Sequence, residues 1–337
     1  MGTKASLIKG SSNYNNILDC LFLIADDIKI SDKKRILIKP CLTHGRNLVS
    51  TTNANAVKAI LDFLSSKTKA EIVIAEGVEV GDTFEVFEKF GYISLAQKYK
   101  VKLIDLNLDN HVIVRGLDRN LNEKKFRVSR TVVESDYRIS ISPIKTHDTY
   151  IMYGPLANIA AGSLLRDETP ESVKFMEKLL QIIPPIISQS PISQEIKSFT
   201  SRFIPNNDKV AINQGYQAIN FNIFKLARAT YPHLSIVDCF VGMEGYGPID
   251  GSPVPLKCAA ASSDFLAAEA LIAKIIGIEF SDIGYLTYCK NKDMGNFDMT
   301  KIDVVGNSID ECGFKFKRHP YYKNQLNWKN LQLEKFF

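Results

Sequence analysis

The sequence lacks any pair of cysteines spaced as C-x-x-C, although six cysteines occur among its 337 residues. This absence argues against a zinc ribbon, a thioredoxin-type redox motif and a locally bound iron–sulfur cluster, all of which use closely spaced cysteines. We therefore expect reduced thiols and no iron–sulfur cluster held by this chain alone.

Long apolar runs are absent as well. The longest, near residues 18–24, is interrupted by Asp19 and is too short to cross a bilayer. Residues 1–10 contain no apolar core of the kind found in signal peptides. These features predict a soluble, cytoplasmic protein that does not associate with membranes.

Two common catalytic motifs are also missing. The chain contains neither a G-x-S-x-G nucleophile elbow nor a P-loop, and its five histidines offer few general bases. A Ser-type nucleophilic mechanism and P-loop nucleotide binding are therefore poorly supported.

Positive charge is concentrated near the C-terminus. The formal net charge is +5, and residues 313–337 contain six basic residues but one acid, Glu334. Such a tail can contact nucleic acid or anionic lipid, but basic tails are more commonly solvated terminal arms. Its aromatic residues, including Tyr321 and Trp328, favour docking on the body of the protein or on a second subunit, so a homo-oligomer is one alternative.

Apolar runs that alternate with amphipathic helical patterns predict an α/β protein with a mostly parallel sheet flanked by helices. Predicted strands lie at 35–39, 71–75, 101–105, 139–143, 234–239, 256–261 and 302–305, and two period-two stretches at 111–115 and 125–129 predict a peripheral β-ribbon. Helices are expected at 13–28, from Asn53 to about 65, at 216–229 and at 264–276.

Proline-rich residues 166–210 interrupt this pattern and predict a helical insertion, either a lid over a site or a surface and oligomer contact. The predicted organisation is a first α/β unit at 1–165, the insertion, a second α/β unit at 211–312 that completes the site, and the tail at 313–337.

Two predicted strands end in a lysine beside a proline. The segment 35–41 places Lys39 and Cys41 at a strand end, and 139–147 is expected to stop at Pro143 and to deliver Lys145 and His147. In open α/β sheets, ligands bind outside the carboxyl ends of strands. We therefore predict one crevice in which Lys39 and Lys145 bind an anion and His147 is a general acid or base.

Glycine and acidic residues follow the predicted strand at 234–239. Asp238 and Glu244 are candidate metal ligands, general bases or partners of the lysines, and Gly245 and Gly247 would let backbone approach a ligand. A glycine-rich turn capped by its acids is the structural alternative.

Asn158 lies in a run of small residues, 154–162, that predicts either an anion cradle at a helix start or close helix packing. His44, just past the first strand end, is a further candidate ligand-binding residue of the crevice.

These segments, in order, resemble the domain of unknown function 362 family. The matching landmarks are 38–40, 76–77, 90–92, 145–147, 158–162, 213–215, 238–251, 263–264, 268–269 and 304–306. Three positions depart from the family pattern: Cys41 replaces an Asn, Ala157 a Lys, and Glu269 an Asp. Some family members are fused to ferredoxin-like modules, so the resemblance implies a ferredoxin-like redox partner as one alternative, and a distant similarity to the fold of nickel-dependent lactate racemase is also expected.

The leading hypothesis is an enzyme that binds a small carboxylate or phosphate, with or without a divalent metal, through Lys39, Lys145, His147, Asn158, Asp238 and Glu244. One alternative is a non-catalytic carrier or assembly factor for a metal centre or an iron–sulfur redox partner. A third, a nucleic-acid-associated protein, depends on the basic tail alone.

Overall fold

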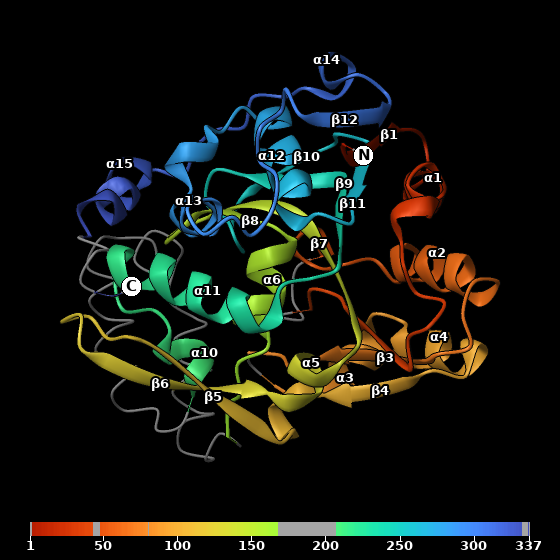
Figure 1. Cartoon of the computed structure of the whole chain (residues 1–337), viewed down its shortest axis with the longest axis horizontal. Helices are drawn as coiled ribbons and strands as arrows, with labels where there is room; N and C mark the ends of the chain where they lie inside the picture. The colour runs from red at the N-terminus through yellow and green to blue at the C-terminus, as the bar shows by residue number, and fades with distance from the viewer. Residues whose placement is uncertain (1, 43–47, 80, 168–206, 332–335, 337) are drawn as a thin grey trace.

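The computed structural model of the chain describes residues 2–42, 48–79, 81–167, 207–331 and 336. Its centre is a ten-stranded sheet with helices on both faces, and a two-stranded antiparallel hairpin lies at one side (Figure 1). The predicted α/β fold, a mostly parallel sheet flanked by helices, is confirmed.

The strands form one continuous sheet that draws on both predicted α/β units. Across the sheet they are β12 (Ile302–Gly306), β1 (Thr3–Lys9), β11 (Cys258–Ser262), β9 (Leu234–Glu244), β7 (Tyr137–His147), β2 (Arg35–Lys39), β3 (Glu71–Glu76) and β4 (Lys102–Asp105), with β10 (Ser252–Val254) beside β9 and β8 (Ile151–Tyr153) beside β7. Strands β9, β7, β2, β3 and β4 are parallel. Strand β11 runs antiparallel between β9 and β1.

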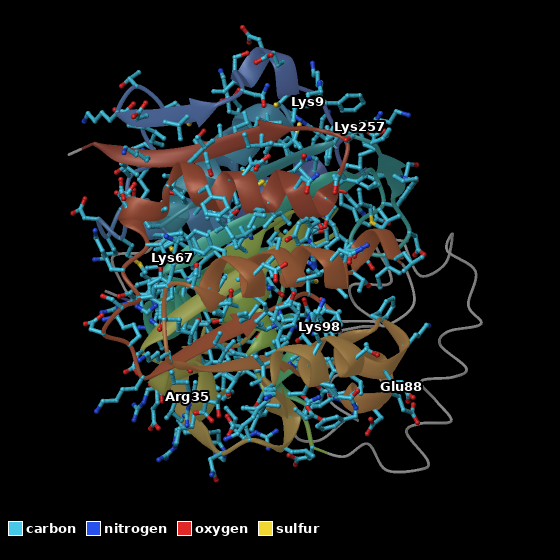
Figure 2. The ribbon with its side chains drawn as sticks, turned by 90° about the vertical axis from the view of Figure 1, so that its right-hand side faces the viewer. Lys9, Arg35, Lys67, Glu88, Lys98 and Lys257 are labelled. Atoms are coloured by element: carbon cyan, nitrogen blue, oxygen red, sulfur yellow. The ribbon has the colours of Figure 1, made fainter. Side chains whose placement is uncertain are left out.

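The central strands are apolar because helices cover both faces of the sheet. Ile36, Leu37 and Ile38 of β2, for example, have no exposed surface. One face is covered by α1 (Asn13–Leu23), α2 (Ala54–Ser65), α3 (Thr83–Lys89) and α4 (Tyr92–Tyr99), and the other by α6 (Pro155–Gly162), α11 (Tyr216–Thr230), α12 (Phe265–Ile275) and α13 (Gly284–Lys290). In Figure 2, α1, α2 and α4 lie one below another on the near face.

Four shorter α-helices also lie in the described part of the chain: α5 (Arg130–Glu134), α10 (Asp208–Ala211), α14 (Ile309–Cys312) and α15 (Tyr322–Gln325). The remaining short helices there are of the 3-10 type: η1 (Ala25–Asp27), η2 (Leu48–Ser50), η3 (Leu106–Leu108), η4 (Phe280–Asp282) and η5 (Leu326–Asn330). Within the described residues, no helix has the length and apolar character needed to cross a membrane.

Two predicted helix starts are formed by side-chain caps. The Asn53 side chain accepts a hydrogen bond from the Asn55 amide at the start of α2, and Asp264 accepts from the Leu266 and Ala267 amides at the start of α12. Each cap satisfies amides that have no partner within the helix.

The predicted end of the strand at Pro143 is wrong. Strand β7 continues to His147, so Lys145 lies within the strand and pairs with Tyr153 of β8. A proline cannot donate to a ladder, and the register of β7 against β9 shifts between Pro143 and Lys145, which accommodates it. Strand β9 likewise runs past Asp238 to Glu244, so Asp238 is not at a strand end.

The predicted β-ribbon is confirmed as β5 (His111–Leu117) paired with β6 (Glu123–Ser129). Most of the proline-rich insertion, residues 168–206, lies outside the described residues, as does the tip of the tail at 332–335 and 337.

The described tail docks on the body of the protein. Trp328 is buried and its indole N–H donates to the Asp282 carbonyl, 2.7 Å away, while the side-chain Nε2 of Gln325 donates to the His147 carbonyl. The Phe316 amide also donates to the Ile276 carbonyl.

Candidate functional site

The strand order reverses between β2 and β7. From β2 the chain adds β3 and then β4 on one side, whereas β7 and β9 lie on the other. Such a switch point separates the loops that leave the strand ends and is the usual ligand position in open α/β sheets. The described residues that follow β2, 40–42 and 48–53, therefore border the expected site.

A buried ion pair lies at this point. The Lys39 ammonium is 2.8 Å from Glu76 Oε1, and the two side chains are 0% and 1% exposed. Lys39 also donates to Asn158 Oδ1 and to the Pro40 carbonyl, each at 3.2 Å. The other carboxylate oxygen of Glu76 accepts from the Leu42 amide at 2.8 Å. The pair therefore connects β2, β3 and α6.

Asn158 is completely buried and ties α6 to the sheet. Its amide nitrogen donates to the Lys39 carbonyl at 3.1 Å and to the Ser140 hydroxyl at 3.0 Å, and its oxygen accepts from the Tyr153 hydroxyl at 3.1 Å. A buried amide with its donors and acceptor engaged fixes local geometry.

Lys145 is the second buried cation. It is 2% exposed, donates to the Ser50 carbonyl at 3.0 Å and lies 3.4 Å from Cys41 Sγ and 4.2 Å from the centre of the Tyr153 ring. Among the described residues, no carboxylate forms an ion pair with it. The ammonium of Lys145 is therefore stabilised by a carbonyl oxygen, a sulfur atom and an aromatic ring.

Cys41 is one of those partners. Burial, the largest single effect, raises the pKa of its thiol, but the Lys145 ammonium, the Tyr153 hydroxyl and the Lys39 ammonium together outweigh it, so the pKa lies below its ordinary value. The Tyr153 hydroxyl is 3.5 Å from Cys41 Sγ. A thiolate beside Lys145 would make a second buried pair next to Lys39 and Glu76.

Close packing explains two glycines, Gly162 at the end of α6 and Gly154 just before its start. A Cβ on Gly162 would lie 2.6 Å from Lys39 Nζ, and one on Gly154 would lie 2.4 Å from a carboxylate oxygen of Glu269. The Leu156 amide donates to Glu269 at 2.7 Å, so the start of α6 already faces an anion supplied by the protein. Burial raises the pKa of Glu269 to about 7.

A further lysine lies behind the Lys39 pair. Lys209 of α10 donates to the Gly162 carbonyl at 2.9 Å, and burial lowers its pKa to about 8. The lysine therefore supports the C-terminal end of α6.

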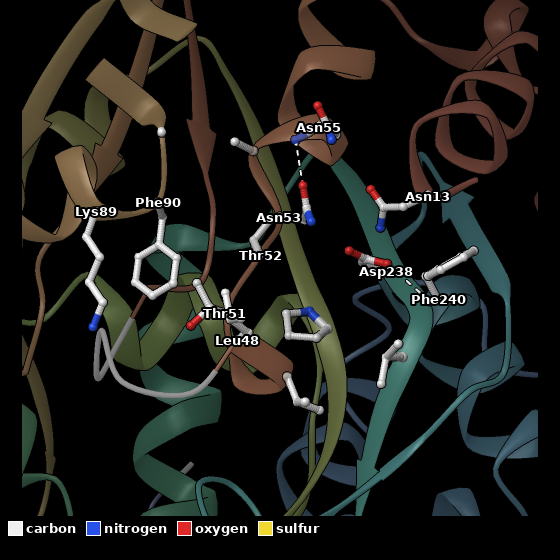
Figure 3. Close-up of a pocket in the computed structure, with 15 residues that line it drawn as sticks. Asn13, Leu48, Thr51, Thr52, Asn53, Asn55, Lys89, Phe90, Asp238 and Phe240 are labelled. Carbon is white, nitrogen blue, oxygen red and sulfur yellow. Dashed lines mark hydrogen bonds between the residues drawn. The ribbon is translucent and has the colours of Figure 1, made fainter. Parts of the chain in front are cut away.

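A cavity of about 680 Å³ adjoins the switch point (Figure 3). It lies between the start of α2, the turn from α3 to α4, and strands β7 and β9. Its walls are formed by Asn13, Leu48, Val49, Thr51, Thr52, Asn53, Ala54, Asn55, Lys89, Phe90, Gly91, Pro143, Asp238, Phe240 and Val241.

Thr52 connects the cavity wall to the buried cluster. Its hydroxyl accepts from the Cys41 amide at 2.9 Å and donates to the Ile141 carbonyl at 3.1 Å. Its carbonyl accepts from the hydroxyl of buried Tyr92 at 3.0 Å. The cluster around Lys39 and Lys145 therefore holds one wall of the cavity without lining it.

Asp238 is the carboxylate of the cavity wall. It is 6% exposed, accepts from the Phe240 amide at 3.1 Å and has a pKa raised by burial. A hydrogen bond from the Asn13 side chain opposes that shift.

The family model described as "Domain of unknown function (DUF362)" matches residues 36–274. The chain belongs to the DUF362 family. The matched range contains β3, β7, β9, α6 and all of β2 except Arg35, and with them every member of the buried cluster described above.

Other comparisons add little to this DUF362 chain. None of the curated proteins matches it. Among solved structures, it is similar to the lactate racemase apoprotein from Thermoanaerobacterium thermosaccharolyticum, with a TM-score of 0.44 and 15% identity. The similarity covers 86% of this chain and 57% of the racemase chain, so the DUF362 chain spans little more than half of that protein.

Sequence reasoning located several residues of the DUF362 cluster. Lys39, Cys41, Lys145 and Asn158, which were predicted to share a crevice, lie together in the buried cluster, and none of them lines the cavity. Of the residues predicted for the site, Asp238 lines the cavity. His44 lies outside the described residues.

Other predicted residues have different surroundings. The His147 ring stacks on Tyr150, with centroids 3.7 Å apart, and its Nδ1 accepts from the Thr149 amide. Glu244 accepts from the Lys317 amide of the tail at 2.7 Å. The Thr146 hydroxyl donates to the Gly245 carbonyl. Gly247 lies so close to Thr146 that a Cβ on Gly247 would overlap the Thr146 carbonyl oxygen.

A metal site is not assembled in the described part of the chain, where no group of three or more His, Cys, Asp or Glu side chains could hold an ion. The residues present around Asp238 and Glu244 do not form a shared donor set there, so no chemical step is assigned to a metal.

Several residues of the site were not assigned a role from the sequence. Glu76 follows an apolar run, a signal that could have paired it with Lys39, because parallel neighbouring strands bring their carboxyl ends together. Asn13 and Tyr153 gave no such signal, because their positions depend on tertiary packing.

Proposed function

We propose that this DUF362 protein is an enzyme that acts on a small anionic molecule, a carboxylate or a phosphate, bound in the cavity beside the β2–β7 switch point. The observation that carries the proposal is the cavity itself, about 680 Å³ and lined by the first residues of α2 together with Lys89 and Asp238. Few places in a protein combine this volume with convergent polar groups.

The start of α2 favours an anion. Ala54 and Asn55 line the cavity, so the positive end of the dipole of this 12-residue helix faces it. Lys89, at the end of α3, adds a formal positive charge to the same wall. A carboxylate or phosphate placed there would be stabilised by the positive potential of both, while the Asn55 amide remains engaged by the Asn53 side chain.

A titratable carboxyl group also lines the cavity, and buried side chains behind the wall are proposed to hold that wall in place. Asp238 lines the cavity, and burial raises its pKa above the ordinary value of an aspartate, so its carboxyl group is proposed to accept or donate a proton there. Lys145, by donating to the Ser50 carbonyl, supports the adjoining wall residues Thr51 and Thr52. Lys39 and Asn158 are likewise proposed to position that wall. His147 does not line the cavity; its ring stacks near that of Tyr153, with centroids 6.2 Å apart, and this is its connection to the buried cluster.

Calorimetric titration of the full chain with inorganic phosphate and with acetate tests the proposal. We expect saturable binding that Lys89→Met weakens about tenfold, equivalent to about 1.4 kcal/mol. Lys98→Met, on the exposed surface of α4, is the matched control and should bind as the wild type does. Absence of binding by both anions would contradict the proposal, and binding without turnover of any substrate would favour the carrier alternative.

A further inference from the structure

We infer that the wall of the cavity formed by Asp238 and Asn13 is a subsite for an ammonium group, so that the ligand is a small zwitterion. The inference rests on the proposed function, in which the anionic end of the same ligand lies at the start of α2.

Asp238 is a buried carboxylate that lacks a cation. Only 6% of it is exposed, and the described residues include no lysine, arginine or histidine in ion-pair contact with it. Its protein partners are the Phe240 amide, at 3.1 Å, and the Asn13 side chain. Removing a carboxylate from water without a counter-charge costs several kcal/mol, and a bound cation would offset that cost.

Asn13 contributes a second acceptor. Its Oδ1 is buried and has no hydrogen-bond partner among the described residues, and its amide nitrogen is the group able to donate to Asp238. An unsatisfied buried acceptor costs about 1–3 kcal/mol. A donor with several N–H groups could satisfy Asn13 Oδ1 and the Asp238 carboxylate at once.

The surroundings indicate an ammonium on a short carbon chain. In Figure 3 the side chains of Asn13, Asn53 and Asp238 converge on one part of the cavity, and Phe240 lies beside them. Pro143 and Val241 provide further apolar lining. An ammonium has three donors and no acceptor, which matches two acceptors from the protein.

Charge is therefore divided along the cavity. Lys89 and the start of α2 provide positive potential, whereas Asp238 provides a negative charge on β9. A ligand with a carboxylate or phosphate at one end and an ammonium at the other complements both walls, and an anion without an ammonium complements one.

The test compares probes that carry one charge or both. Binding of methylammonium, acetate, inorganic phosphate, glycine, β-alanine and phosphoethanolamine is measured by calorimetry on the full chain. We expect at least one zwitterion to bind about tenfold or more tightly than acetate or phosphate, and Asp238→Asn to remove that advantage without weakening acetate or phosphate binding, because the variant removes a negative charge from the cavity wall. Asp303→Asn, on the exposed surface of β12, is the control.

The outcomes separate the two proposals. If acetate or phosphate binds but no zwitterion gains affinity, the ammonium subsite is wrong and the anion site stands; if none of the probes binds, both are wrong. Asn13→Leu provides a second variant that retains the carboxylate, and it should reduce the zwitterion advantage by about tenfold, as expected for a hydrogen bond to a charged group. An unchanged advantage in both variants would overturn the subsite.

Discussion

The Lys39 ammonium lies 2.8 Å from the Glu76 carboxylate, and neither side chain reaches solvent. Removing one member of a buried pair leaves the other charge uncompensated, so Glu76→Gln should lower the free energy of unfolding by roughly 3–5 kcal/mol. Replacing both, as Lys39→Met with Glu76→Leu, should cost less than the sum of the two single changes.

Urea denaturation measures these differences. Glu71→Gln is the matched control, because Glu71 pairs with Arg35 at 3.1 Å on an exposed part of the same strand pair and should contribute about 0–1 kcal/mol. Equal losses for Glu76→Gln and Glu71→Gln would contradict the importance of the buried pair.

Gly162→Ala tests how tightly α6 packs on Lys39. Alanine is favoured over glycine in a helix by about 1 kcal/mol, but its Cβ would lie 2.6 Å from Lys39 Nζ. We expect the clash to prevail and to destabilise the protein by about 1–3 kcal/mol in urea denaturation. Gly313→Ala, whose nearest neighbour would be 3.3 Å away, serves as the control, and a stabilised Gly162→Ala would show that Lys39 can move aside.

Glu269 should make stability depend on pH. Its folded pKa of about 7 lies above the unfolded value, so the folded state binds the proton more tightly. Stability should therefore be highest below the unfolded pKa and should fall as pH rises toward 7, with a total change of about 3 kcal/mol for this group.

Glu269→Gln retains the acceptor for the Leu156 amide but cannot ionise. Relative to the wild type, we expect it to be more stable at pH 8 and similar at pH 4, when unfolding is followed by circular dichroism at each pH. The exposed control Glu279→Gln should follow the wild-type profile. A Gln variant with the same pH dependence as the wild type would refute the assignment to Glu269.

Lys145 should set the ionisation of Cys41. The Lys145 ammonium lies 3.4 Å from the Cys41 sulfur. When the ultraviolet absorbance of Cys41→Ser is subtracted from that of the wild type over a pH titration, the thiolate of Cys41 should appear below the pH at which an ordinary thiol ionises. Lys145→Met removes the charge that opposes burial, so the titration should move upward. If Cys41 titrates at the same pH in both backgrounds, the sulfur does not sense Lys145.

The sequence predicted the part of the site that depends on parallel strands. Lys39 and Lys145 follow apolar runs. Because β2 and β7 are parallel neighbours, the carboxyl-terminal residues of both strands lie at the same edge of the sheet. Asn53 and Asp264 were identifiable as helix caps from local sequence alone. The class of fold also followed, because alternating strands and helices leave few other arrangements.

Contacts between distant segments could not be read in the same way. Asn13 reaches Asp238 because α1 packs on β11 and β9, and Glu244 is engaged by Lys317 from the tail. Pro143 was expected to end its strand, since the shift in register that accommodates it depends on β9. Each case is decided by a partner at least 73 residues away, and no local pattern encodes it.

Strand β1 pairs with β11 and β12, so the first strand of the chain lies between two strands made near its other end. During synthesis, β1 leaves the ribosome while both of its partners are still untranslated. The parallel sheet from β9 to β4 can form before then, whereas β1 must remain unpaired, with its ladder groups exposed, until β11 and β12 emerge. This edge of the protein is therefore the last to close and the one most dependent on protection of the nascent chain.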